Sequence, residues 1–314
     1  MVFTFNPYGA PSPLTRLEAA ARAGDGDAAL DVARHYLAGR GVSRDLSKCR
    51  AWLGVGAKAG NETAILGLAA FEARGTGGAA DWTGALDTLA LLDRRPRARS
   101  RRERDLIDAM ALDSEGNPTR DFSVETVTDD PLIRRVPAFA SDEEIAFLLE
   151  LGKPALQPSL VVDPQTGQQR PDPVRTSRNT AFPWINERPF INALNRRIAH
   201  VSGFDQQFGE PLQLLHYSGD QQYKRHHDAI PGADNQRVAT ALLYLNEDYD
   251  GGETAFPDLD MKIKGRKGEL LIFSNVDEKA APHPLAWHTG EPVTRGQKFV
   301  ATRWIREKPF GPRA

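Results

Sequence analysis

Apolar side chains recur at helical spacing through the first hundred residues, and glycine-bearing turns separate the stretches that carry them. Small residues, mainly alanine, stand where neighbouring helices would touch. This pattern predicts closely packed pairs of helices. The clearest helical stretches span residues 28–37, 46–58, 62–73 and 82–91.

The same region repeats itself with a shift of 36 residues, so that Ala23-Gly24-Asp25 recurs as Ala59-Gly60-Asn61. The shift also carries Ala33 onto Ala69, Gly39 onto Gly75 and Asp45 onto Asp81. A period of this length is typical of helical arrays in which each repeat packs on the next. The first part of the chain is therefore predicted to be a helical repeat domain.

The segment Tyr36-Leu37-Ala38-Gly39-Arg40-Gly41-Val42, followed by Asp45, resembles Sel1-like repeats, a subclass of the tetratricopeptide superfamily. The resemblance covers about two repeats. The second copy departs from it at Glu72, where an aromatic residue is expected. Such arrays usually present a concave surface that binds proteins, so we expect this part to recruit a peptide or protein partner.

The pattern of the chain changes after residue 130. Ser141 precedes three acidic residues and an apolar face, which predicts a capped helix as far as Leu151, and a second helix is predicted over residues 189–201. Short β-rich runs follow Pro211, over residues 212–217, 238–245, 269–273 and 299–305. This spacing predicts a jelly roll or barrel whose mouth could hold a ligand. The fold class is thus α+β, with domains over residues 1–104 and 105–314.

Seven arginines lie just before the predicted boundary. They are Arg94, Arg95, Arg97, Arg99, Arg101, Arg102 and Arg104. Aromatic residues that would stack on bases are absent nearby, so we interpret the cluster as a solvated linker or helix surface rather than a phosphate-binding patch.

Composition excludes several classes of protein. The chain has 314 residues, 40% of them apolar, and a formal net charge of −2, which provides no field that would attract nucleic acid or an anionic membrane. Cys49 is the single cysteine, which excludes an internal disulfide framework and a cysteine-based zinc site. No segment approaches the length of a membrane span, and the first residues do not read as a signal peptide. We therefore expect a cytoplasmic protein.

The strongest chemical signal is His226-His227-Asp228, followed far along the chain by His288. Alternate residues of a strand point to the same face, so His226 and Asp228 can point together while His227 points away. With His288 from a distant strand they would form a facial triad of two imidazoles and one carboxylate, the ligand set of non-heme Fe(II) oxygenases. Zinc accepts the same ligands with a water, which leaves a hydrolase open.

Lys298 favours the oxygenase. On a strand that begins near it, Lys298 shares a face with Val300, Thr302 and Trp304, so its ammonium would project into the same cavity as an indole. A buried lysine without a counterion is unfavourable, whereas a bound dicarboxylate supplies that counterion. A solvent-exposed strand lysine is the alternative.

Residues 130–310 resemble the catalytic domain of the prolyl 4-hydroxylases, within the 2-oxoglutarate- and Fe(II)-dependent oxygenases. The motifs that carry the resemblance are Arg175-Thr176-Ser177, Tyr217 to Asp228, Gly251 to Pro257, and His288 to Val293 with Gly296, Lys298 and Trp304. The resemblance implies a double-stranded β-helix that hydroxylates an unactivated C–H bond, in the first place that of a prolyl residue in a peptide or protein. It also implies Fe(II), 2-oxoglutarate and O2, with ascorbate as a candidate reductant.

The resemblance assigns roles to single residues. His226, Asp228 and His288 would bind the metal. Lys298, Thr254 and Tyr217 would bind 2-oxoglutarate, whereas Tyr223, Arg237 and Trp304 correspond to substrate-binding residues. Core packing remains an alternative for both tyrosines and for Trp304, as does a salt bridge for Arg237. The polar segment over residues 161–175 is either a loop that closes over substrate or an ordinary connection.

Other histidines are assigned no role in chemistry. His283 competes with His288 for the third ligand position, but only His288 is followed by the Pro-Val and Gly-x-Lys of the resemblance. His35 and His200 lie in helical patterns and are predicted to be structural.

Three further functions stay open at this point. The same chemistry could act on another peptidyl residue, a free amino acid or a natural-product intermediate. The chain could instead be a protein-interaction adaptor with an inert oxygenase domain, or a zinc hydrolase. Nothing in the sequence indicates an oligomeric state.

Overall fold

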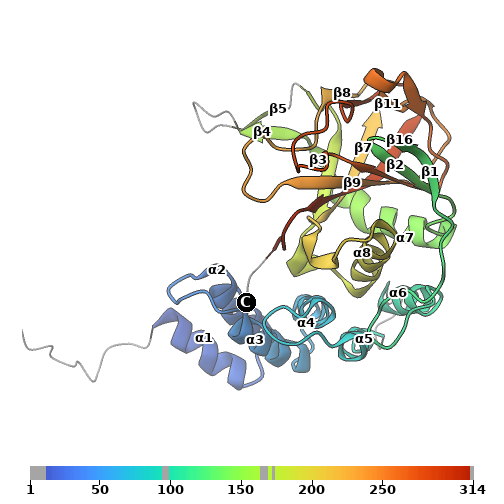
Figure 1. The fold of residues 1–314 in the computed structure, drawn as a ribbon. Helices are drawn as coiled ribbons and strands as arrows, with labels where there is room; N and C mark the ends of the chain where they lie inside the picture. Colours follow the sequence, from blue (N-terminus) through green and yellow to red (C-terminus); the bar gives the residue numbers. More distant parts are fainter. Residues whose placement is uncertain (1–11, 94–98, 163–168, 172–173, 312–314) are drawn as a thin grey trace, which may run out of the picture.

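The computed structural model describes residues 12–93, 99–162, 169–171 and 174–311, which form a helical array beside a sheet-rich part (Figure 1). The array is coloured blue to cyan, and helix α8 (Pro189–Ser202) lies between it and the sheets. Its helices are α1 (Pro13–Arg22), α2 (Gly26–Ala38), α3 (Leu46–Lys58), α4 (Glu62–Arg74) and α5 (Trp82–Ala90).

The helix ends coincide with the residues that recur in the sequence. The N-caps of α2, α3, α4 and α5 are Asp25, Asp45, Asn61 and Asp81. Each side chain accepts a hydrogen bond from a backbone N–H of the first turn. Gly39 and Gly75 end α2 and α4 in the left-handed conformation, which favours glycine. The four predicted helices are confirmed, whereas α1 was not predicted.

The basic cluster contributes to helix packing. Arg99 and Arg102 of α6 (Arg99–Asp108) both pair with Glu150 of α7 (Asp142–Gly152), and Arg104 pairs with Asp93. Arg94, Arg95 and Arg97 lie outside the described residues. The predicted boundary between residues 104 and 105 falls inside α6, which packs against both α5 and α8.

The sheet-rich part contains two principal antiparallel sheets. The larger has eight strands in the order β1 (Glu125–Asp129), β2 (Leu132–Val136), β13 (Leu270–Ser274), β9 (Arg237–Tyr244), β16 (Gln297–Arg306), β7 (Leu212–Ser218), β6 (Arg178–Phe182) and β3 (Gln157–Pro158). The smaller has the order β12 (Met261–Ile263), β11 (Thr254–Phe256), β14 (His288–Gly290) and β8 (Tyr223–His226). Two separate two-stranded sheets complete the sheet-rich part. In one, β10 (Asp250–Gly251) pairs with β15 (Val293–Arg295), and in the other β4 (Leu160–Val162) pairs with β5 (Gln169–Pro171).

The chain passes repeatedly from one sheet to the other. Strands β7, β9, β13 and β16 belong to the large sheet, whereas β8, β11 and β14, which lie between them in sequence, belong to the small one. A double-stranded β-helix requires this alternation. The four predicted strands correspond to β7, β9, β13 and β16, and the predicted helices to α7 and α8.

The motif Arg175-Thr176-Ser177 lies directly before β6, which begins at Arg178, and Arg175 makes an isolated bridge with Tyr223. Within the segment 161–175, β4 and β5 pair as antiparallel strands, and residues 163–168 and 172–173 lie outside the described residues.

The helical array is joined to the sheet-rich part through buried polar contacts. Arg74, at the end of α4, donates to Glu187 at 2.6 Å, and Asn192 of α8 donates to the same carboxylate at 2.9 Å. The Glu187 side chain is 1% exposed. Beside this pair the ring of Phe71 packs on Trp184, with centroids 5.8 Å apart. Among the helices in the described part of the chain, none has the length and apolar character needed to cross a bilayer.

Removing Arg74 should destabilise the protein, because Arg74→Ala leaves the Glu187 carboxylate buried without its cation. We expect the free energy of unfolding in urea to fall by about 3 kcal/mol. Arg34→Ala is the matched control, since the Arg34 side chain is 58% exposed and pairs with Asp31 on one helix. That control should change stability by at most about 0.5 kcal/mol. Equal losses in both variants would contradict a buried pair between the two parts.

Candidate metal centre and co-substrate pocket

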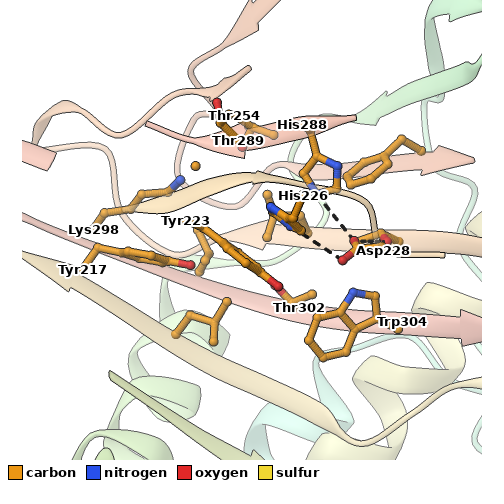
Figure 2. Close-up of a pocket in the computed structure, with 16 residues that line it drawn as sticks. Tyr217, Tyr223, His226, Asp228, Thr254, His288, Thr289, Lys298, Thr302 and Trp304 are labelled. Carbon is orange, nitrogen blue, oxygen red and sulfur yellow. Dashed lines mark hydrogen bonds and ion pairs between the residues drawn. The ribbon is translucent and has the colours of Figure 1, made fainter. Parts of the chain in front are cut away.

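Three side chains that could bind a metal converge between the two sheets (Figure 2). His226 ends β8 and His288 begins β14, and the register of the two strands places them opposite each other. The Nε2 atoms of His226 and His288 lie 3.7 and 3.6 Å from the Asp228 carboxylate, one at each oxygen. One ligand atom from each residue lies within 4.8 Å of the others. Asp228 follows β8 in a bend, and so it does not share a strand with His226 as predicted.

Backbone carbonyls orient both imidazoles. Nδ1 of His226 lies 2.7 Å from the Lys224 carbonyl oxygen, and Nδ1 of His288 lies 3.0 Å from that of Ala286. A neutral ring that donates from Nδ1 keeps a lone pair on Nε2, which is the atom that faces Asp228 in both residues. The site is therefore preorganised to present two imidazole nitrogens.

The protonation states also suit a metal. Burial and, after it, the neighbouring His288 lower the pKa of His226 to about 3. Burial would raise the pKa of Asp228, but the two imidazoles and a hydrogen bond from Thr240 outweigh it, so that pKa is lowered. At neutral pH His226 is therefore neutral and Asp228 is an ionised carboxylate. Two nitrogen donors and one oxygen donor, with coordination positions left for other ligands, fit Fe(II).

A cavity of about 50 Å³ adjoins the triad and is lined by both sheets. Lys298 reaches it from β16 and is 4% exposed. Its Nζ donates to the Gly252 carbonyl at 2.7 Å, and among the described residues no carboxylate lies within ion-pair distance. Burial lowers the pKa of Lys298 from 10.5 to about 8. Val300, Thr302 and Trp304 line the same cavity, as the strand pattern predicted.

The other predicted co-substrate residues surround the Lys298 ammonium. Tyr217 stands opposite Lys298 in the pairing of β7 with β16, and the ammonium lies 5.7 Å from the centre of its ring. The Thr254 hydroxyl lies 2.8 Å from the phenol of Tyr244, which positions it at the cavity wall. The three residues therefore meet at the end of the cavity away from Asp228 (Figure 2).

Tyr223 lies directly against the metal-binding residues. Its ring stacks on His226 with centroids 3.4 Å apart and planes 11° from parallel, and the Arg175 guanidinium lies 5.6 Å from its centre. Figure 2 shows the phenol extended along the cavity toward Thr302. The tyrosine is thus a wall of the cavity rather than a remote core residue.

Arg237 and Trp304 differ in their access to the cavity. Trp304 lines it, whereas Arg237 is not a lining residue and its guanidinium lies 4.0 Å from the centre of the indole ring. Arg237 donates two hydrogen bonds to Glu210, at 2.6 and 3.0 Å. The salt bridge that the sequence left open is therefore present, and Arg237 packs against the Trp304 ring.

The histidines that were assigned no role lie outside the triad. His227 points away, with Nε2 3.0 Å from the His283 carbonyl oxygen and its ring edge-on to Trp287. His283 lies 2.7 Å from the carboxylate of Asp130. Its exclusion as a ligand agrees with this geometry.

Sequence reasoning missed Thr240, Asn275 and Tyr244. Thr240 donates to Asp228 at 2.6 Å, and Asn275 donates to Thr240 at 3.0 Å. Tyr244 holds Thr254. The available signal was a polar residue within the apolar run 238–245, on the side of the strand that faces Asp228.

The triad beside a buried, unneutralised lysine defines a non-heme Fe(II) oxygenase that takes an anionic co-substrate. Residues 212–306 match the model of the 2OG-Fe(II) oxygenase superfamily. Prolyl 4-hydroxylase 1 of Arabidopsis thaliana is 36% identical over 203 residues, which cover 59% of this chain and 72% of the relative. Prolyl 4-hydroxylase 5 of the same plant is 32% identical over 222 residues, covering 63% and 75%.

Among solved structures, the viral collagen prolyl hydroxylase from Paramecium Bursaria Chlorella virus-1 is 28% identical, with a TM-score of 0.46. The match covers 57% of this chain and 98% of the viral one. The chain belongs to the prolyl 4-hydroxylase family of 2OG-Fe(II) oxygenases. Its cofactor is Fe(II) and its co-substrate is 2-oxoglutarate.

The titration of Lys298 should be visible in the stability of the ligand-free protein. Its pKa is about 8 when folded and near 10.5 when unfolded, so the unfolded state binds more protons between these values and stability rises with pH there. Between pH 7.5 and 10 the parent should gain about 2 kcal/mol relative to Lys298→Met.

The measurement is urea denaturation with a chelator at both pH values. Lys48→Met is the control, because the Lys48 side chain is 60% exposed, and it should follow the parent. A constant difference between the parent and Lys298→Met would show that Lys298 is not desolvated in the folded protein.

Proposed function

We propose that this enzyme hydroxylates a prolyl residue of a peptide or protein. The observation that carries the proposal is the triad of His226, Asp228 and His288 beside the buried Lys298 ammonium, which donates to a backbone carbonyl. The relatives bear the name prolyl 4-hydroxylase, and the two reported above match 59% and 63% of this chain.

The chain's own groups have separable tasks. His226, Asp228 and His288 would hold Fe(II), which when bound supplies the oxidising power that the side chains lack. Lys298 would neutralise the far carboxylate of 2-oxoglutarate, and the hydroxyls of Thr254 and Tyr217 lie where they could bind the same group. The surrounding apolar walls exclude water from the reacting centre.

The part of the cavity where substrate would bind has an aromatic wall and polar atoms that have no hydrogen-bond partner among the described residues. Trp304 and Tyr223 present flat apolar surfaces that suit the ring of a proline. The Trp304 Nε1 and the Thr302 Oγ1 are buried and have no hydrogen-bond partner among the described residues. We assign Trp304 and Tyr223 to substrate binding and Arg237 to the support of Trp304. The second candidate function is hydroxylation of another peptidyl residue or of a small molecule by the same chemistry.

The helical array is proposed to recruit a protein partner, although part of its α4 surface packs on α8 and on Trp184. The interpretation as Sel1-like repeats, action in the cytoplasm and the use of ascorbate remain predictions from the sequence.

The reaction is tested by incubating the protein with Fe(II), 2-oxoglutarate and proline-containing peptides in air. We expect succinate formation and a gain of about 16 mass units on the peptide, the mass of one oxygen. His226→Ala, Asp228→Ala and His288→Ala should reduce succinate formation to the background without protein, whereas His283→Ala should retain it.

The three rival functions give different outcomes. Equal background turnover in the parent and the triad variants favours an inert adaptor. Hydrolysis that needs zinc but neither oxygen nor 2-oxoglutarate favours a zinc hydrolase. Succinate formation with no modified peptide points to a different substrate class.

Binding of 2-oxoglutarate should weaken at high pH, because free Lys298 loses its proton near pH 8 while the bound dianion favours the charged form. Above pH 8 we expect the dissociation constant to rise by about tenfold per pH unit, measured anaerobically with Mn(II) in place of iron. Lys298→Arg is the control, since its guanidinium stays charged and its affinity should vary little over this range. The same pH dependence in both proteins would exclude Lys298 as the titrating group.

A further inference from the structure

A buried chain of hydrogen bonds ends at the metal-binding carboxylate. Thr240 lies in the middle of β9, opposite Phe273 of β13 and Trp304 of β16, and it is 2% exposed. Asn275 follows β13 and is fully buried. Neither residue is a candidate ligand, yet both connect to Asp228 through their side chains.

The direction of these hydrogen bonds follows from counting protons. A threonine hydroxyl has one proton, and ionised Asp228 can only accept, so the 2.6 Å contact is a bond from Thr240 Oγ1 to Asp228 Oδ2. Thr240 must then accept at its lone pair, and the Asn275 amide donates to it at 3.0 Å. Donation along the chain polarises the hydroxyl and strengthens its bond to the carboxylate.

Asn275 is itself held by the backbone. Its N–H donates to the Val238 carbonyl at 2.8 Å, and its carbonyl accepts from the His283 N–H at 3.0 Å. These bonds fix Asn275 between the start of β9 and the segment that leads to β14. The position of the Thr240 hydroxyl is therefore set by both neighbouring segments.

The Thr240 hydroxyl affects how the two oxygens of Asp228 can bind a metal ion. A free carboxylate near a divalent ion can bind through one oxygen or through both. Thr240 occupies a lone pair of Oδ2, the oxygen that lies 3.6 Å from His288 Nε2, whereas Oδ1 lies 3.7 Å from His226 Nε2 and accepts no bond from Thr240. The bond from Thr240 thus opposes a rotation that would bring both oxygens to one ion.

We propose that Thr240, supported by Asn275, is a positioning residue that restricts Asp228 to coordination through one oxygen. The coordination position kept open in this way is one that 2-oxoglutarate needs, because a 2-oxo acid binds through two atoms. The inference rests on the proposed metal centre, and it concerns how many positions remain for the co-substrate rather than whether metal binds.

The test is Thr240→Val, which keeps the shape of the side chain and removes the hydroxyl. Mn(II) binding is followed through the electron paramagnetic resonance of the free ion, and 2-oxoglutarate binding to the Mn(II)-saturated protein is measured by calorimetry without oxygen. We expect the 2-oxoglutarate dissociation constant to rise about tenfold in Thr240→Val. Thr240→Ser, which retains the hydroxyl, should restore the parent value.

Two further variants keep the test decisive. Thr76→Val removes a buried threonine hydroxyl far from the site and should bind Mn(II) and 2-oxoglutarate like the parent. If Thr240→Val does not fold, Thr240→Cys replaces the hydroxyl with a weak donor of similar size and should shift 2-oxoglutarate binding in the same direction.

Each outcome bears on one claim. Absence of Mn(II) binding by the parent chain refutes the metal centre itself. Parent-like 2-oxoglutarate affinity in Thr240→Val, even with lower stability in urea, overturns the positioning role and leaves a structural one. An equally weakened Thr240→Ser also overturns it, because the hydroxyl would then not be the determinant.

Discussion

The pairing of β14 with β8 is the contact on which the site depends. It sets His288 opposite His226, two residues that are far apart in sequence, and both strands belong to the small sheet. Asp228 and Lys298 are then brought to the same cavity by the turn after β8 and by β16 of the large sheet. A shift of this register by one residue would turn one imidazole out of the cavity and remove the triad.

Buried charge is handled differently at the site and elsewhere. Glu187 is neutralised by Arg74, and Glu144 by Arg197, so that these carboxylates stabilise the assembly of helices. Lys298 has only a carbonyl as its polar partner in the described structure, and burial lowers its pKa. Such an incompletely compensated cation lowers the stability of the ligand-free fold and is expected where an anion binds. The same contrast separates Arg237, which Glu210 neutralises, from the residues that face the cavity.

The sequence could predict those structural features that depend on residues close together in the chain. The repeat helices follow from caps and glycines at fixed spacing, and β16 follows from an alternating run that ends at Trp304. The triad was predicted because His226 and Asp228 are two residues apart and because the residues after His288 match the resemblance to the prolyl 4-hydroxylases. Partners set by tertiary structure could not be predicted: Glu210 for Arg237, Thr240 for Asp228, and Glu150 for the basic cluster each lie on another element. The helix α1 was missed although Ser12 and Pro13 carry a start signal, because it lies outside the recurring period.

The central claim is that one ferrous ion and one dicarboxylate share this cavity. The most direct measurement is a crystal structure of the protein with Mn(II) and 2-oxoglutarate, grown without oxygen. The account predicts the ion bound by Nε2 of His226, Nε2 of His288 and one oxygen of Asp228, with the far carboxylate of 2-oxoglutarate on Lys298. An ion bound elsewhere, or a co-substrate carboxylate directed away from Lys298, would contradict it.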